Sequence, residues 1–333
     1  MDSLLVGIDL GTTHLKAGLY RLDGHLLRIA SRPTRYRTGR GGRSVLDPQE
    51  LWAATLEVLG EILAALPGQV ASIGITSMAE TGLLVDARSG EPRTPLIPWF
   101  DNSTAPIAAG LINADPEAIH RQFLKTGIRL NFKCGLVKLL WLKEREPGLL
   151  DGAVWLNSAD YIAYRLGGAM ATDFSLAGRT FAFDITRKQW DRAWLQSVGI
   201  PEEVFPPALP SGSPAGRLSP AAVMQPGLPA GLPAGIPVSV TGHDHVNAAF
   251  AVDCITSTPQ EAHFSPQRVF DSIGTAESML GLLPEREPGA APLGLPELVG
   301  DRIQDVIHCM GLQGACRMAY GPKGRPAGAA VRP

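Results

Sequence analysis

The chain has 333 residues, of which 45% are hydrophobic and 19% charged, and its formal net charge is -2. This length and composition suit a soluble globular protein with two domains. The near-neutral charge argues against nucleic acid and anionic membranes as partners, and no apolar run reaches the roughly 20 residues that span a bilayer. The cysteines are scattered without Cys-x-x-Cys spacing, which predicts a reducing, cytoplasmic location. The N-terminal segment lacks a basic region, so we expect no signal peptide.

The first 30 residues predict three consecutive strands. Apolar or alternating segments at 4–10, 15–22 and 26–30 are typical of strands, and Asp23-Gly24 predicts a hairpin turn between the last two. A helix is predicted to follow, with Asp47 as its N-cap, Pro48 in the first turn and apolar residues at helical spacing as far as residue 66.

Further strands are predicted at 70–76, 83–86 and 238–241, and helices at 136–145 and 158–166. The Pro- and Gly-rich stretch 201–237 predicts a loop. Strands that lead and helices that follow predict an α/β fold, a mixed sheet with flanking helices. We expect a domain at 1–250 and part of a second at 251–333. The tail at about 310–333 is rich in Gly, Pro, Ala, Arg and Lys, and we expect it to be disordered.

A small, hydroxylated turn joins the first two predicted strands. Asp9 ends the first strand, and Gly11, Thr12 and Thr13 offer backbone N–H groups and hydroxyls to a phosphate, with Lys16 just beyond. Asp9 is a candidate Mg²⁺ ligand, because Mg²⁺ takes one or two carboxylates together with phosphate oxygens. The alternative is a plain hairpin with a solvated carboxylate. A second turn of this kind, with Gly274 and Thr275, predicts the opposite side of a phosphate clamp.

The segment 242–245 reads Gly-His-Asp-His after a predicted strand. Asp244 is a candidate base that accepts a proton from a substrate hydroxyl. His243 and His245 flank Asp244. We expect their side chains to point partly to opposite faces with no third ligand near, and we therefore expect no metal site there. The expected role of the two imidazoles is to shape the loop.

Glu80 lies at the end of another predicted strand, and Trp99 and Asp101 follow about twenty residues further along the chain. Carboxylates accept hydrogen bonds from sugar hydroxyls, and an indole covers the C–H face of a sugar. The alternative is a surface loop beside a core tryptophan. The sequence contains no P-loop, no Gly-x-Gly-x-x-Gly after the first strand, and neither His-Glu-x-x-His nor Gly-x-Ser-x-Gly.

Together these motifs resemble the FGGY carbohydrate kinases, which include glycerol kinase, xylulokinase and gluconate kinase. The resemblance covers roughly residues 4–282 and follows the family order: GIDLGTT at 7–13, PWFD at 98–101, KLLWL at 138–142, DYIAYRL at 160–166, GHD at 242–244 and SIGTAE at 272–277. The sequence departs from the family at two positions. Ala79 stands where glycerol kinase has an arginine, and Asn102 stands where the family commonly has an arginine after Asp101.

The resemblance implies an RNase H-like (actin-like ATPase) fold whose first domain is complete and whose second is partial. It implies ATP-dependent phosphorylation of a sugar or polyol hydroxyl with Mg²⁺. The turn at 9–16 would hold phosphate together with Gly274 and Thr275. Asp244 would be the catalytic base and also contact the acceptor, and Glu80 would bind acceptor hydroxyls.

Two alternatives stay open: a non-catalytic sugar-binding remnant of a kinase, and an actin- or Hsp70-like ATPase. Only 58 residues (333 minus 275) follow Thr275, so we expect little or no kinase activity from the chain by itself. A homodimer also remains open.

Overall fold

A six-stranded mixed sheet forms the centre of the computed structural model, which describes residues 3–64, 68–229, 232–256, 269–273 and 277–281. The strand order is β13-β14-β6-β1-β2-β3. The strands are β1 (Ser3–Leu10), β2 (His14–Arg21), β3 (Leu26–Pro33), β6 (Gln69–Ser77), β13 (Pro214–Arg217) and β14 (Pro237–His243). β1, β6 and β14 are parallel, whereas β2, β3 and β13 are antiparallel to their neighbours. The carboxyl ends of the three parallel strands therefore meet at one edge.

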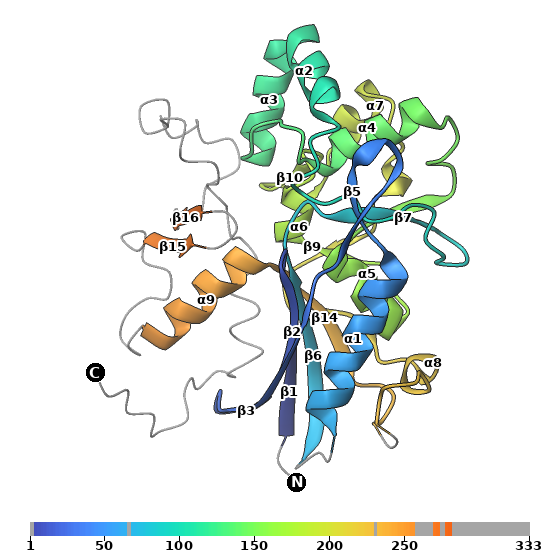
Figure 1. The fold of residues 1–333 in the computed structure, drawn as a ribbon. Coiled ribbons are helices and arrows are strands. Elements are labelled where there is room, and N and C mark those ends of the chain that lie inside the picture. Colours follow the sequence, from blue (N-terminus) through green and yellow to red (C-terminus); the bar gives the residue numbers. More distant parts are fainter. Residues whose placement is uncertain (1–2, 65–67, 230–231, 257–268, 274–276, 282–333) are drawn as a thin grey trace.

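Helices lie on both sides of this sheet (Figure 1). α1 (Pro48–Leu63), α5 (Ser158–Gly167) and α8 (Pro220–Val223) lie on one side, and α9 (Asp244–Thr256) lies on the other. The sheet face under α1 carries the alternate buried residues of β1, namely Leu4, Val6, Ile8 and Leu10. The carboxylate of Asp47 caps α1 by accepting hydrogen bonds from the backbone N–H groups of Gln49 and Glu50, as its sequence predicts.

A second hydrophobic core lies beyond the carboxyl edge of the sheet. The antiparallel pair β7 (Gly82–Asp86) and β8 (Ala153–Asn157) connects it to the sheet. Around it lie α2 (Ala105–Ala114), α3 (Pro116–Thr126), α4 (Gly135–Arg145) and α7 (Arg192–Ser197). The fully buried Trp155 and Phe181 are among its largest side chains.

Short elements complete the described chain. They are β4 (Tyr36–Thr38), the 3-10 helix at Arg40–Gly42, β5 (Ser44–Leu46), β9 (Thr172–Asp173), α6 (Phe174–Gly178), β10 (Phe183–Asp184), β11 (Gln189–Trp190), the 3-10 helix at Glu202–Val204, β12 (Ala208–Leu209), β15 (Val269–Ile273) and β16 (Glu277–Gly281). In the described ranges, no helix has the length and apolar character that crossing a membrane requires.

The predicted α/β fold with a mixed sheet is confirmed, and the predicted strands and helices are present with shifts of a few residues at their ends. The expectation of a loop throughout 201–237 is wrong, because β12, β13 and α8 lie inside it. β13 is an edge strand, a position that tolerates proline and glycine because one side of its backbone needs no partner. α9 runs past residue 250, so the predicted boundary between domains falls within a helix. That division into domains stays a prediction, and the tail at 310–333 lies outside the described residues.

Candidate active site

The three parallel strands bring the predicted site residues to one edge of the sheet. Asp9 near the end of β1 lies beside Thr76 of β6, and Gly242 of β14 lies beside the same threonine on its other side. Ser77 pairs with His243 at the next position. Segments more than 60 residues apart in sequence therefore end side by side, as the strand pattern predicts.

Asp244 follows β14 directly and begins α9. Its Oδ1 atom accepts a hydrogen bond from the backbone N–H of His245 at 2.8 Å and lies 3.1 Å from Nε2 of His243. Burial raises the pKa of Asp244 to about 6, the nearby His245 opposes this change, and the charges of Asp9 and Glu80 add to it. A carboxyl group with such a pKa is ionised at neutral pH and is still a competent proton acceptor.

A glycine is required where β14 turns toward Asp244. Gly242 has φ +112°, and an added Cβ would lie 2.4 Å from Oγ of Ser175 and 2.7 Å from Oδ2 of Asp173. The Ser175 hydroxyl donates to Asp173 at 2.8 Å and accepts the backbone N–H of His243 at 2.9 Å. This chain of hydrogen bonds fixes the strand end that carries Asp244.

Asp9 has the properties expected of a cation ligand. Its Oδ1 atom is buried and has no hydrogen-bond partner among the described residues. Burial raises the pKa of Asp9, and the charge of Lys16, its cross-strand neighbour, partly offsets this effect. A buried, unpaired carboxylate oxygen is costly unless a cation or a proton meets it. The residues present therefore fit a hard divalent cation at this position.

The Gly-Thr-Thr turn between β1 and β2 is closed by a backbone hydrogen bond from Gly11 N–H to the carbonyl of His14 at 3.1 Å. A Cβ on Gly11 would approach that carbonyl oxygen to 2.9 Å, so a larger residue would open the turn. The Thr12 hydroxyl accepts a hydrogen bond from the indole Nε1–H of Trp99 at 2.9 Å. The Thr13 hydroxyl lies at the exposed rim, 3.3 Å from Nδ1 of His14.

Glu80 is buried and paired with a residue from a distant segment. Arg179 donates to Oε1 of Glu80 from Nε at 3.0 Å and also from Nη2, and both side chains are 7% exposed. The backbone of Glu80 has φ +61°, a conformation that costs free energy for a residue other than glycine. Surrounding contacts must hold it there, and strain of this kind concentrates at functional sites.

Lys138 supplies one of these contacts. Its buried ammonium group donates to the carbonyl oxygens of Glu80, Ile97 and Pro98, the last two at 3.1 and 3.0 Å. Burial lowers the pKa of Lys138 to about 8, while the charges of Glu80 and Asp101 act in the opposite direction. One side chain on α4 thus fixes both loops that carry the predicted recognition residues.

Trp99 and Asp101 lie on the second of these loops. The Trp99 ring packs edge-on against Phe100 with centroids 5.6 Å apart, and the ammonium group of Lys133 lies 5.1 Å from the Trp99 centroid. Asp101 is buried, and its Oδ1 atom accepts hydrogen bonds from the backbone and hydroxyl of Ser103. Asp101 therefore stabilises its own turn at the same time as it adds negative charge to the site.

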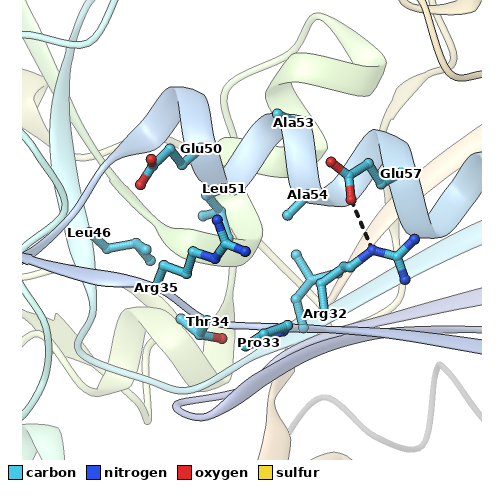
Figure 2. A pocket seen from close by; sticks show the side chains of 11 residues that line it. Arg32, Pro33, Thr34, Arg35, Leu46, Glu50, Leu51, Ala53, Ala54 and Glu57 are labelled. Atoms are coloured by element: carbon cyan, nitrogen blue, oxygen red, sulfur yellow. Dashed lines mark hydrogen bonds and ion pairs between the residues drawn. The ribbon is translucent and has the colours of Figure 1, made fainter.

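An open groove of about 360 Å³ extends from this edge along the sheet face opposite α1, and Asp9, Lys16, Thr76 and Asn247 are among the residues that line it. A separate hollow of about 170 Å³ lies between β3 and α1. Figure 2 shows that Arg35 extends across this hollow, while Arg32 pairs with Glu57. None of the predicted site residues lines the second hollow.

The structure brings together Asp9, the 11–13 turn, Lys16, Glu80, Trp99, Asp101 and Asp244 around one edge of the sheet. Gly274 and Thr275 lie outside the described residues, between the antiparallel strands β15 and β16. Sequence reasoning missed Arg179 and did not assign a role to Lys138. A search of the sequence for arginine and lysine side chains that could pair with a buried carboxylate would have pointed to them.

The expectation that His243 and His245 diverge is wrong. Their rings are 5.1 Å apart, and one nitrogen of each lies with an oxygen of Asp244 in a cluster of three ligand atoms, all within 4.8 Å of one another. The reason is that residues two apart along a strand lie on the same face, so the strand period gives no ground for the two rings to diverge. The junction between β14, which ends at His243, and α9, which begins at Asp244, keeps the rings close together.

The chain is similar to known proteins over most of its length. The model of the "FGGY family of carbohydrate kinases, N-terminal domain" matches residues 4–251. A glycerol kinase of Symbiobacterium thermophilum is 31% identical over 286 residues, which are 83% of this chain and 53% of that protein. A glycerol kinase of Ectopseudomonas mendocina is 34% identical over 227 residues, 65% of this chain and 46% of that protein.

Solved structures show the same fold. The xylulose kinase of Rhodospirillum rubrum matches with a TM-score of 0.72 and 25% identity, over 83% of this chain and 55% of that chain. The gluconate kinase of Lactobacillus acidophilus matches with a TM-score of 0.71 and 20% identity, over 84% of this chain and 54% of that chain. The chain thus spans about half the length of the relatives it matches.

Proposed function

Because the chain belongs to the FGGY family of carbohydrate kinases, we propose that it carries the acceptor side of an enzyme that transfers the γ-phosphoryl group of ATP to a sugar or polyol hydroxyl. The observation that carries this proposal is the meeting of three carboxylates, from Asp9, Glu80 and Asp244, at one edge of the sheet. The pKa of Asp244 responds to the charges of the other two. Phosphoryl transfer needs such a group to position the hydroxyl and accept its proton.

Asp244 is the proposed base. As the acceptor oxygen attacks the γ-phosphorus atom, its proton passes to the carboxylate of Asp244, and the bond between phosphorus and the β–γ bridging oxygen of ATP breaks. The hydrogen bonds from Ser175 and the Gly242 turn hold Asp244 at the strand end throughout. Positioning of this kind supplies much of the rate enhancement in phosphoryl transfer.

Glu80 is the proposed acceptor-binding carboxylate. Arg179 occupies its Oε1 atom and so orients the carboxylate, whose other oxygen then accepts hydrogen bonds from substrate hydroxyls. Ala79 has no charged side chain, and the guanidinium beside Glu80 comes instead from Arg179, in a distant segment. Trp99 contributes an apolar ring face and Asp101 adds negative charge.

ATP and Mg²⁺ are the proposed cofactors. The unpaired Oδ1 atom of Asp9 would hold Mg²⁺, which supplies charge neutralisation on the phosphates when bound. The Gly11–Thr13 turn and Lys16 would face the phosphates. Since the Thr12 hydroxyl already contacts Trp99, we expect a phosphate contact from Thr12 through its backbone N–H. Gly274 and Thr275 are proposed as the second phosphate turn.

A carbohydrate-kinase family match favours a kinase over an actin- or Hsp70-like ATPase. A cytoplasmic location and a soluble sugar or polyol as partner follow from the same proposal. A non-catalytic sugar-binding role shares this acceptor site and is distinguished from the kinase by turnover of a full-length version; the following experiment tests the shared site. Each of a panel of sugars and polyols is tested for a rise in the melting temperature of the chain, with and without Mg·ATP. Stabilisation by one class of polyol supports the acceptor site, and no shift with any member contradicts it.

A further inference from the structure

Two imidazoles flank the carboxylate that we propose as the base. Nε2 of His243 lies 3.1 Å and Nε2 of His245 lies 3.9 Å from Oδ1 of Asp244. Two imidazole nitrogens and a carboxylate are a typical ligand set for Zn²⁺, with a fourth position left for water. Neither imidazole is needed for the proton transfer proposed above.

The arrangement of the rings suits a single ion. Two imidazoles on one tetrahedral Zn²⁺, each with a Zn–N distance of about 2.0–2.1 Å, hold their ring centroids roughly 5 Å apart. The observed separation of the His243 and His245 centroids is 5.1 Å, with an angle of 76° between the ring planes. Little movement is therefore required to bring both nitrogens onto one ion.

The chemistry of His243 adds an independent observation. Its ring is buried, and its Nδ1 atom has no hydrogen-bond partner among the described residues, so the protein alone does not satisfy this imidazole. The charge of Arg179 opposes a cation at this position, whereas the carboxylates of Asp244 and of the nearby Asp9 and Glu80 favour one.

We propose that His243, Asp244 and His245 form a binding site for a divalent transition metal such as Zn²⁺, separate in its donor set from the oxygen site at Asp9. Nitrogen ligands favour Zn²⁺ or Co²⁺ over Mg²⁺, which prefers oxygen. An ion bound here occupies the carboxylate of Asp244. If the proposed kinase function holds, on which this consequence rests, the metal inhibits phosphoryl transfer by competing with the acceptor hydroxyl.

The test measures metal binding by the chain without nucleotide or polyol, so its result does not depend on kinase activity. Co²⁺ is titrated while the visible spectrum is recorded, and Zn²⁺ is titrated by calorimetry. We expect one ion per chain, tetrahedral Co²⁺ bands in the visible, and no thiolate charge-transfer band in the near-ultraviolet. Loss of outer-shell partners alone weakens metal sites 10–100-fold, so His245→Gln, which removes a ligand, should weaken binding at least about tenfold.

His120→Gln is the matched control, because His120 is exposed on α3 and its ring stacks on Phe123. It should bind both ions as the parent chain does, and the melting temperature of each variant without metal verifies that it is folded. Three results would overturn the proposal: no saturable binding of either ion, binding that survives both His243→Gln and His245→Gln, or a thiolate band. A thiolate band would assign the ion to cysteines instead.

Discussion

The indole Nε1–H of Trp99 donates a hydrogen bond to the hydroxyl of Thr12 at 2.9 Å, across 87 residues of sequence. Trp99 lies on the proposed acceptor loop and Thr12 on the proposed phosphate turn. A second contact, from Thr12 Oγ1 to the sulfur of Met78 at 3.6 Å, connects the turn to the end of β6. The two halves of the proposed reaction centre are therefore mechanically joined before any ligand is bound.

Trp99→Phe should weaken acceptor binding. The substitution keeps an aromatic ring but removes one hydrogen bond, which is worth about 0.5–1.5 kcal/mol. We expect polyol affinity of the chain to fall about two- to tenfold by calorimetry. Trp190→Phe is the control, because the Trp190 indole also donates a single hydrogen bond, to the carbonyl of Pro206 at 2.8 Å, far from the site. Equal losses in the two variants would contradict a special role for Trp99.

The pKa of Asp244 predicts the acid limb of the pH profile. Only the ionised carboxylate accepts a proton, so kcat/KM should fall as pH decreases through about 6, with a slope approaching tenfold per unit. The measurement requires a full-length version, that is, these residues within a protein of its relatives' length. Asp9 carries a charge that raises the pKa of Asp244, so Asp9→Asn should move the limb to lower pH. A limb that does not move in Asp9→Asn would refute this electrostatic coupling.

Substitution of Glu80, the buried partner of Arg179, should weaken acceptor binding selectively. Hydrogen bonds to a charged group are worth about 1.5–3 kcal/mol, so Glu80→Gln should weaken polyol binding by roughly 10- to 150-fold while nucleotide binding by a full-length version is unchanged. Because both partners are buried, the variant should also lose stability. Asp23→Asn, in an exposed hairpin turn, is the isosteric control. Unchanged polyol affinity in Glu80→Gln would place the acceptor site elsewhere.

Local signals in the sequence were enough to predict five of the six strands of the main sheet, all but β13, together with the Asp47 cap and the turn at 9–16. Each of these signals depends on residues only a few positions apart in the sequence. Once the strands pair in parallel, their carboxyl ends lie at the same edge of the sheet. The Glu80–Arg179 pair spans 99 residues, and no periodicity links its members. The sequence around Lys138 predicts an apolar helix and gives no sign of a buried ammonium group. Its three carbonyl partners belong to loops whose path depends on tertiary contacts. α2 and α3 were also missed, although α3 has the same local start signal as α1, with Asp115 as its N-cap and Pro116 in the first turn.

Lys138→Met should destabilise the chain without removing a side chain that contacts the proposed substrate. Methionine fills a similar volume but removes the donor that three buried carbonyl oxygens share. The carbonyls of Ile97 and Pro98 keep a backbone N–H partner, so among the described residues it is the Glu80 carbonyl that is left without a donor, at a cost of about 1–3 kcal/mol. We expect a loss of roughly 1–3 kcal/mol in the free energy of unfolding, measured by urea denaturation. Lys143→Met is the control on the same helix, because the Lys143 ammonium group is exposed and donates to the carbonyl of Gly199. Comparable losses in both variants would show that Lys138 has no special structural role.

The most direct test of the proposed function is ATP-dependent phosphorylation of sugars and polyols by a full-length version and by its Asp244→Asn variant. ADP release is followed in a coupled assay for each acceptor. We expect turnover in the range of about 1–100 s⁻¹ with at least one acceptor. For Asp244→Asn we expect a loss of roughly 10²–10⁴-fold in kcat, with acceptor binding largely retained in calorimetry. Turnover that survives in Asp244→Asn at near the parent rate, or the absence of turnover with every acceptor, would contradict the proposed function.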